Sequence, residues 1–299
     1  MINIKKLKYI YQKSDYDIQF KFQKNTMKSE IFTKIKDVVF CPKEVQEYFL
    51  QCDKMLILTI KDINFTIFFK SFLNISMTKL IKSAKQFLSL KKMFNISKSF
   101  NIFFITYPMK RFIPSNDIIR PIHINGGFTS TKENDIFILR TEEFGKVLLH
   151  ELVHHITIIH NENWSVSQIK QLKQHFRISE ETVLIPNEAV VEFWATLFYL
   201  FFISFDYHIP IKKLIEIEQK FSLRQTQKLL LFQNKKFWNE KSNAYAYIVL
   251  KTILLSNYSK LMKLPYDLNF LTDLFISHNM NKQISSHNNS LRMMILSDI

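Results

Sequence analysis

The chain has 299 residues, of which 47% are hydrophobic and 29 are phenylalanine, and this excludes an intrinsically disordered protein. The length allows one large domain or two small ones with a substantial buried core. A formal net charge of +15 indicates contact with an anionic partner, either a nucleic acid or an acidic surface. Lysine supplies 35 of the 41 basic residues, however, so a solvated lysine-rich surface explains the charge more simply.

The cysteine content and the apolar segments favour a cytoplasmic protein without a membrane anchor. Cys41 and Cys52 are the only cysteines, and they form neither a Cys-x-x-Cys pair nor a disulfide framework. The N-terminus lacks the apolar core of a secretory signal. The most apolar stretch, residues 189–205, contains Glu192 and is short for a membrane span, so we expect a buried helix there.

The first 140 residues predict an α+β region. Apolar residues recur at helical spacing over residues 77–94 with lysines on the other face, which indicates a helix that backs a sheet. Residues 1–40 show no clear repeat and predict only short strands. The other predicted elements are a helix over 42–51, a β-hairpin of strands 55–60 and 65–69, and strands over 102–107 and 135–140.

Two of the three glycines in the chain, Gly126 and Gly127, are adjacent. A chain so poor in glycine is expected to keep this pair where the backbone geometry demands it, or where another part of the structure approaches closely. An ordinary turn is the alternative. The region after residue 160 predicts mainly helices, over 169–176, 188–202, 210–221, 224–232 and 243–257, and a polar segment over 278–290.

The most informative motif is His-Glu-Leu-Val-His at residues 150–154. No helix breaker interrupts residues 141–159, so we expect one helix there, with Thr141 as its N-cap. Residues four apart share one face of a helix, and His150 and His154 can therefore bind one ion. Chance alone predicts roughly 0.01 occurrences of this pattern in such a chain. The motif predicts a zinc site, with Glu151 as general base for a metal-bound water.

A zinc site of this kind needs a third protein ligand, and one candidate is a third histidine. His160 stands where the pattern His-Glu-x-x-His-x-x-Gly-x-x-His places it. Thr157 replaces the glycine of that pattern, however. On a continuous helix, His160 would also point about 280° away from His150.

The other candidate is a carboxylate from the apolar helix over residues 188–202, with Asn187 as its N-cap. Glu188 and Glu192 are four residues apart and share one helical face. We predict that Glu188 binds the metal and that Glu192 accepts a hydrogen bond from a ligand histidine. The opposite roles, or two carboxylates that only face water, are the alternatives.

These segments carry a resemblance to a known family. His-Glu-x-x-His followed by a helix with Glu-x-x-x-Glu resembles the gluzincin, or thermolysin-like, metallopeptidases. More narrowly, residues 140–151 (RTEEFGKVLLHE), 187–195 (NEAVVEFWA) and 244–251 (AYAYIVLK) look like metallopeptidases of large DNA viruses. The likeness covers roughly residues 100–255 and implies a location in the host cytoplasm or the virion.

The resemblance implies an α+β, zincin-like fold in two parts. Residues 1–160 would form a mixed β-sheet lobe with a backing helix and the active-site helix, and residues 161–299 a mostly helical lobe that carries the third ligand. Gluzincins bind peptide substrates along an edge strand that precedes the motif helix. Residues 124–129 are the candidate for that strand.

The predicted function is therefore a zinc-dependent metallopeptidase acting on a protein or peptide. A tyrosine, either Tyr245 or Tyr247, is a candidate oxyanion donor, with His208 and His287 next in line. The alternative for both tyrosines is a place in the core. The alternative function is a non-enzymatic virion or nucleic-acid-associated protein that keeps a zincin fold.

Overall fold

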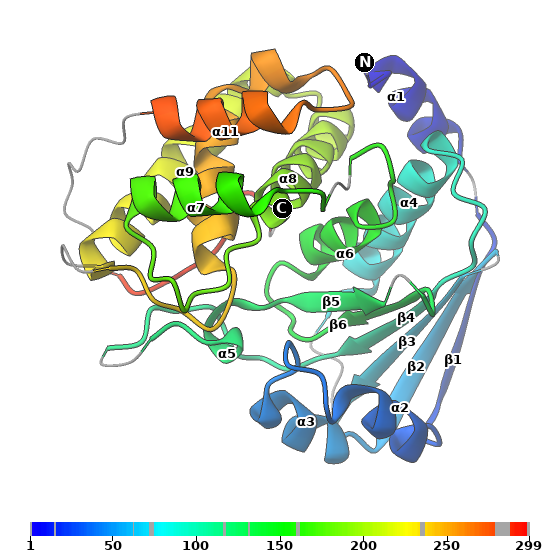
Figure 1. Cartoon of the computed structure of the whole chain (residues 1–299). Coiled ribbons are helices and arrows are strands. Elements are labelled where there is room, and N and C mark those ends of the chain that lie inside the picture. The colour runs from blue at the N-terminus through cyan, green and yellow to red at the C-terminus, as the bar shows by residue number, and fades with distance from the viewer. Residues whose placement is uncertain are drawn as a thin grey trace. The chain divides into compact units, whose positions relative to one another are not determined.

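The computed structural model describes residues 2–14, 16–61, 63–71, 75–115, 118–130, 132–159, 162–233, 237–278 and 288–297. The chain forms two compact units, each considered by itself. The sheet unit contains residues 4–111 and 125–155, and the helical unit contains residues 1–3, 112–124 and 156–299 (Figure 1). The α+β class is confirmed, whereas the predicted domain boundary at residue 160 stays a prediction.

A mixed six-stranded sheet organises the sheet unit, with the strand order β1-β2-β3-β4-β6-β5. Strands β3, β4 and β6 run parallel to one another, and the other neighbouring pairs are antiparallel. The parallel strands lie inside the sheet and are almost wholly buried, which explains their runs of isoleucine and phenylalanine. The strands are β1 (Ile18–Lys24), β2 (Lys54–Ile60), β3 (Ile63–Phe69), β4 (Asn101–Ile105), β5 (Gly127–Ser130) and β6 (Asp135–Ile138).

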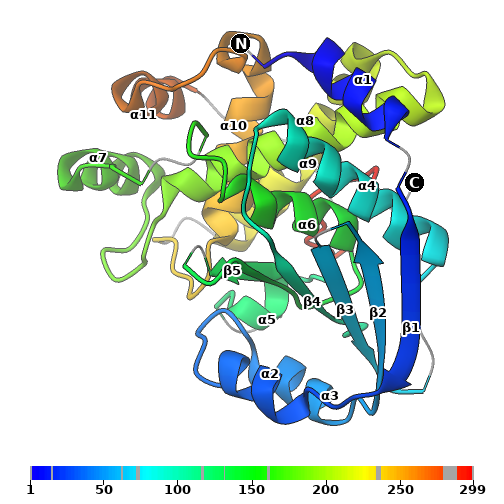
Figure 2. The ribbon, with the colours of Figure 1, turned by 90° about the vertical axis from the view of Figure 1, so that its right-hand side faces the viewer.

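Helices cover both faces of this sheet (Figures 1 and 2). Helices α4 (Met77–Met93) and α6 (Phe144–Val153) pack against each other on one face, where Phe87 meets Phe65 of β3. Helices α2 (Lys28–Ile35) and α3 (Lys43–Leu50) lie on the other face, where Phe49 meets Phe68. Helix α1 (Ile4–Lys13) packs on α4. The helix over 42–51, the helix over 77–94 and the β-hairpin are therefore confirmed.

The first 40 residues differ from the prediction. They form helices α1 and α2 and the single strand β1, rather than several short strands. The buried residues of α1 are Leu7 and Ile10, which lie three positions apart. The apolar face of this helix therefore consists of only two side chains. In the sequence, two apolar residues among lysines and tyrosines do not show a clear helical period, and for this reason the helix was not predicted.

The helical unit is built around α8 (Pro186–Tyr207), which contacts α9, η1 and α10. Length and composition alone would allow α8 to cross a membrane, with a mean hydropathy of 1.5, but 89% of its most apolar window is buried inside the structure. The predicted buried helix is thus confirmed. The other elements are α5 (Pro121–Ile124), α7 (Val166–Phe176), α9 (Ile211–Gln233), the π-helix η1 (Ala246–Leu250), α10 (Lys251–Ser256), the 3-10 helix η2 (Tyr258–Leu261) and α11 (Leu268–Ser277).

Two predicted helices, over 210–221 and 224–232, are one continuous helix, α9. The predicted break falls near Ser222, whose hydroxyl donates a hydrogen bond to Glu218 one turn earlier, at 3.2 Å. This bond satisfies a polar side chain inside the helix without ending it. Most of the predicted polar segment over 278–290 lies outside the described residues.

Candidate functional site

The motif helix α6 is shorter than predicted at both ends. It runs from Phe144 to Val153, and His154 is its C-cap with φ −58° and ψ −23°. The prediction of Thr141 as N-cap is wrong, because Glu143 takes that position in the left-handed conformation with φ 58°. His154 keeps helical angles, so both histidines of the motif still belong to the last turn.

A buried ion cluster fixes the start of α6. The guanidinium Nη1 of Arg111 lies 2.5 Å from Oε2 of Glu143, and the backbone N–H of Arg111 donates to Oε2 of Glu142 at 2.7 Å. Desolvation raises the pKa of Glu142, although the charge of Arg111 opposes this shift. The left-handed conformation of a glutamate costs energy, and these bonds hold it in place. The carboxylates of Glu142 and Glu143 therefore bind Arg111.

Both glycines stand where α6 packs against the start of β5. A Cβ atom on Gly126 would collide with the guanidinium of Arg111 and come within 2.6 Å of Val147. A Cβ on Gly127 would lie 2.6 Å from the carbonyl oxygen of Phe137 and 3.0 Å from Oε1 of Glu151. Neither glycine has a positive φ. Close approach is thus the reason for the pair, as one of the two predictions stated.

The two motif histidines present their nitrogens to one point. Nε2 of His150 lies 3.3 Å from Nε2 of His154, and the rings are inclined by 70°. Two nitrogen ligands on a tetrahedral Zn²⁺ at 2.0–2.1 Å are themselves about 3.3–3.4 Å apart. The C-terminal end of a helix carries partial negative charge, which also favours a cation there. The separation of the two nitrogens is therefore compatible with two ligands of one tetrahedral ion.

The next residue, His155, has a different role. Its Nε2 lies 2.8 Å from Oγ1 of Thr129 on β5, and its ring meets the ring of Phe100 at 4.8 Å. The hydroxyl of Thr129 donates to the carbonyl oxygen of Asp135 at 3.0 Å, so the Nε2–H of His155 must be the donor in the first bond. His155 thus ties the end of α6 to β5.

The two carboxylates of the second predicted helix lie on α8. The prediction of Asn187 as N-cap is wrong, since Ile185 is the N-cap and Pro186 is the first helical residue. Glu188 is in the first turn and half-buried, and Glu192 is only 1% exposed. The alternative of two carboxylates facing water is therefore wrong.

His150 and His154 belong to the sheet unit and Glu188 to the helical unit, and all three carry side chains that can bind a metal ion. Glu188 as the third ligand stays a prediction. The competing ligand His160 lies outside the described residues. The rotation argument against it assumed a continuous helix, and this premise is wrong because α6 ends at Val153.

The two tyrosines of the predicted donor segment differ in their environments. Tyr245 is 1% exposed and packs between Phe176 and Trp238, with ring centroids 5.6 and 5.5 Å away, and burial raises its pKa. It is a core residue. Tyr247 is half-buried on the π-helix η1, an element that often marks functional sites. Of the two histidines named as substitutes, His208 is exposed at the C-cap of α8, and His287 lies outside the described residues.

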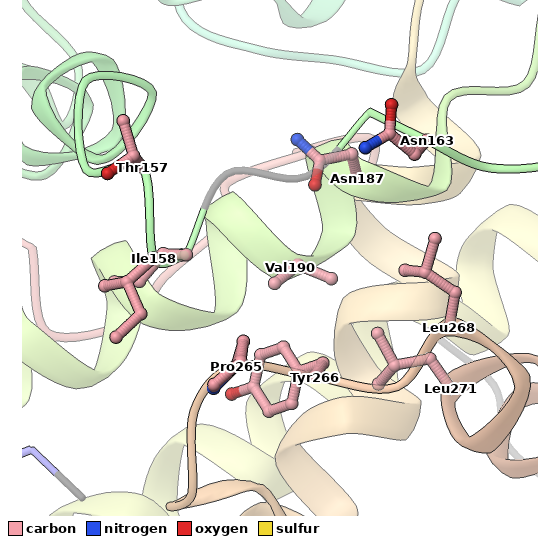
Figure 3. Close-up of a pocket in the computed structure, with 10 residues that line it drawn as sticks. Thr157, Ile158, Asn163, Asn187, Val190, Pro265, Tyr266, Leu268 and Leu271 are labelled. Atoms are coloured by element: carbon pink, nitrogen blue, oxygen red, sulfur yellow. The ribbon is translucent and has the colours of Figure 1, made fainter.

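A cavity of about 270 Å³ lies in the helical unit beside α8. Figure 3 shows apolar side chains from α8 and α11 around it, with Asn163 and Asn187 at one end. Tyr266 is the one titratable residue among the described lining residues, and it accepts a hydrogen bond from Trp194 and donates one to Leu261, both at 2.7 Å. The described part of the lining therefore contains no carboxylate, imidazole or thiol.

No protein-family model, curated protein or solved structure matches the chain. The chemistry of the candidate group must therefore be argued from its own geometry.

The close packing at Gly127 generates a prediction. Gly127→Ala should lower the free energy of unfolding by about 1–3 kcal/mol, because the carbonyl oxygen of Phe137 is backbone and cannot move aside cheaply. Chemical denaturation followed by circular dichroism measures the change. Ser130→Ala, on the same strand, is the control and should change stability far less. Equal stability of Gly127→Ala and wild type would show that β5 and α6 do not pack this tightly.

Proposed function

We propose that this protein is a zinc-dependent metallopeptidase that hydrolyses peptide bonds of a protein or peptide substrate. The observation that carries the proposal is the pair of imidazole nitrogens 3.3 Å apart on one helical turn, with a buried glutamate between the two histidines in the chain. That donor set and spacing are those of a catalytic zinc site rather than a closed structural one, which usually has four protein ligands.

In this proposal His150, His154 and Glu188 hold the ion, and Glu192 orients a ligand histidine through a hydrogen bond. A bound Zn²⁺ supplies Lewis-acid polarisation of the scissile carbonyl and a lowered pKa of water. Glu151 is 4% exposed and follows a ligand in the chain, as a base beside the metal requires. It accepts a proton from the attacking water and transfers it to the leaving amine.

The edge strand β5 is the proposed binding site for the peptide substrate beside Glu151. β5 is the last strand in the order and runs antiparallel to β6, its only partner among the described strands. An extended peptide can pair with such an edge through backbone hydrogen bonds. Gly127 begins β5 and approaches the carboxylate of Glu151, so a peptide on this strand would pass close to the base. The strand predicted over residues 124–129 is β5, Gly127–Ser130. It begins three residues later than predicted, because residues 121–124 form α5.

The first prediction concerns the metal. Purified wild type should contain one zinc ion per chain, and His154→Ala should contain almost none, as measured by mass spectrometry of the metal content. His175→Ala is the control, because this exposed histidine of α7 belongs to no candidate ligand set, and it should retain zinc. Glu188→Ala should lose zinc, whereas Glu192→Ala should weaken its binding by roughly 10- to 100-fold. Full zinc content in Glu188→Ala would refute the assigned third ligand.

The second prediction separates the base from the ligands. Glu151→Gln should keep zinc and the wild-type circular dichroism spectrum but lose hydrolysis, because an amide cannot accept the proton. A fluorescein-labelled casein digest is the first assay. Loss of zinc in this variant would assign Glu151 a ligand role instead. A wild-type protein that binds zinc and cleaves no substrate would favour a non-enzymatic role for the fold.

The third prediction concerns the oxyanion. Tyr247→Phe should lower turnover by roughly ten- to a thousandfold with zinc retained, as expected when one donor is removed. Tyr245→Phe is the matched control, since Tyr245 lies in the aromatic core and should leave turnover unchanged. If Tyr247→Phe cleaves substrate as fast as wild type, the donor is another residue.

A further inference from the structure

The positive charge of the chain is concentrated on two helices that pack together. Helices α1 and α4 comprise 10 and 17 residues, and they carry nine lysines and no carboxylate. The 54 residues from 63 to 116 contain no aspartate or glutamate, whereas 26 such residues in 299 predict about five. A uniformly lysine-rich surface does not explain this separation of charge.

The packing of α1 on α4 directs these lysines outward. Leu7 and Ile10 of α1 are buried, so the remaining positions of this short helix are at least partly exposed to solvent. None of the ion pairs among the described residues includes Lys5, Lys8, Lys13, Lys85 or Lys92. Four of these five side chains are exposed, and Lys85 is half-buried. We name these five residues and the two helices that carry them the α1–α4 surface.

A hollow of about 390 Å³ lies where the C-terminal ends of both helices meet. Its lining includes Lys61, Lys91 and Lys92, the aromatic ring of Tyr16, and the polar side chains of Asn95 and Ser97. The ammonium of Lys61 lies 4.8 Å from the centre of the Tyr16 ring. Among the described residues, Asp17 is the one carboxylate that lies within two positions in the sequence of a lining residue. It accepts a hydrogen bond from Gln19. Three ammonium groups beside amide and hydroxyl donors favour a phosphate, because their full positive charges outweigh the partial negative charge of the helix ends.

We infer that the α1–α4 surface binds the phosphate backbone of a nucleic acid, with one phosphate in the hollow. Lysine is a flexible point charge that neutralises phosphates without reading bases, so the binding is independent of sequence. An anionic membrane is the less favoured partner, because interfacial helices insert their apolar face and that of α1 is buried against α4. No part of this inference depends on the metal site.

The test compares two proteins with the same reduction of charge. Binding of a fluorescein-labelled 30-base-pair DNA duplex is followed by fluorescence anisotropy between 50 and 200 mM NaCl, a range over which phosphate contacts change affinity strongly. One variant removes five lysines of the surface, and the control removes five exposed lysines of the same unit outside it. The surface variant is K5Q/K8Q/K13Q/K85Q/K92Q, and the control is K21Q/K24Q/K43Q/K110Q/K132Q.

The surface variant should bind DNA at least tenfold more weakly than wild type. The slope of log K against log salt should become less negative by about 0.9 for each phosphate that the variant no longer neutralises. The control should stay within about threefold of wild type. K61Q/K92Q should reproduce part of the effect if the hollow holds a phosphate. Circular dichroism confirms that each variant is folded, so the outcome depends on neither zinc binding nor peptidase activity.

Three results would overturn the inference. An equal weakening of DNA binding in the control would show that only the total charge matters. Unchanged DNA binding in the surface variant would place the nucleic acid elsewhere. Binding of wild type to phosphatidylserine vesicles but to neither the duplex nor a single-stranded RNA of 30 nucleotides would identify a membrane as the partner.

Discussion

The sheet unit depends on the close contact between α6 and the two glycines before and at the start of β5. Because Gly126 has no side chain, Arg111 can reach Glu143 and fix the first residue of α6. Because Gly127 has none, the next turns of the helix can lie directly on the strand, with Glu151 against its backbone. The bond from His155 to Thr129 secures the other end. These three contacts fix the position of α6 over the sheet and its rotation about its own axis. They therefore also fix the direction in which the histidine pair points.

The contact also explains why the unit tolerates buried charge at the start of α6. Arg111 and Glu143 are almost completely inaccessible, and a buried ion pair contributes little to stability unless its hydrogen bonds are well formed. Here the ion pair determines the residue at which α6 begins. It therefore contributes to a unique folded structure more than to stability. The lysines of the α1–α4 surface are the opposite case, since four of the five are exposed and can serve an external partner.

The sequence was most informative where a pattern is local. The β-hairpin, α4 and the His-Glu-x-x-His motif each depend on spacing within one element, and their residues lie as predicted. The ends of α6 could not be predicted, because Arg111, some 30 residues away in the chain, decides where it starts. The false break within α9 arose from polar residues that bond inside the helix. The proposed pairing of α6 with the carboxylates of α8 rests on ligand chemistry, since no periodicity connects two separate helices.

The order of the two units along the chain has a consequence for biosynthesis. The sheet unit uses no residue beyond His155, and its only interruption is the excursion over residues 112–124. Closing a loop of that length costs only about 2 kcal/mol beyond a constant term. We expect this unit to fold while the ribosome is still adding the helical unit. At roughly 5–20 residues per second, the 34 residues from His154 to Glu188 take about 2–7 seconds, so the imidazole pair would leave the ribosome that long before Glu188 does. With Glu188 as the proposed third ligand, zinc that binds during synthesis would meet two protein ligands, and zinc added to the finished apoprotein would meet three.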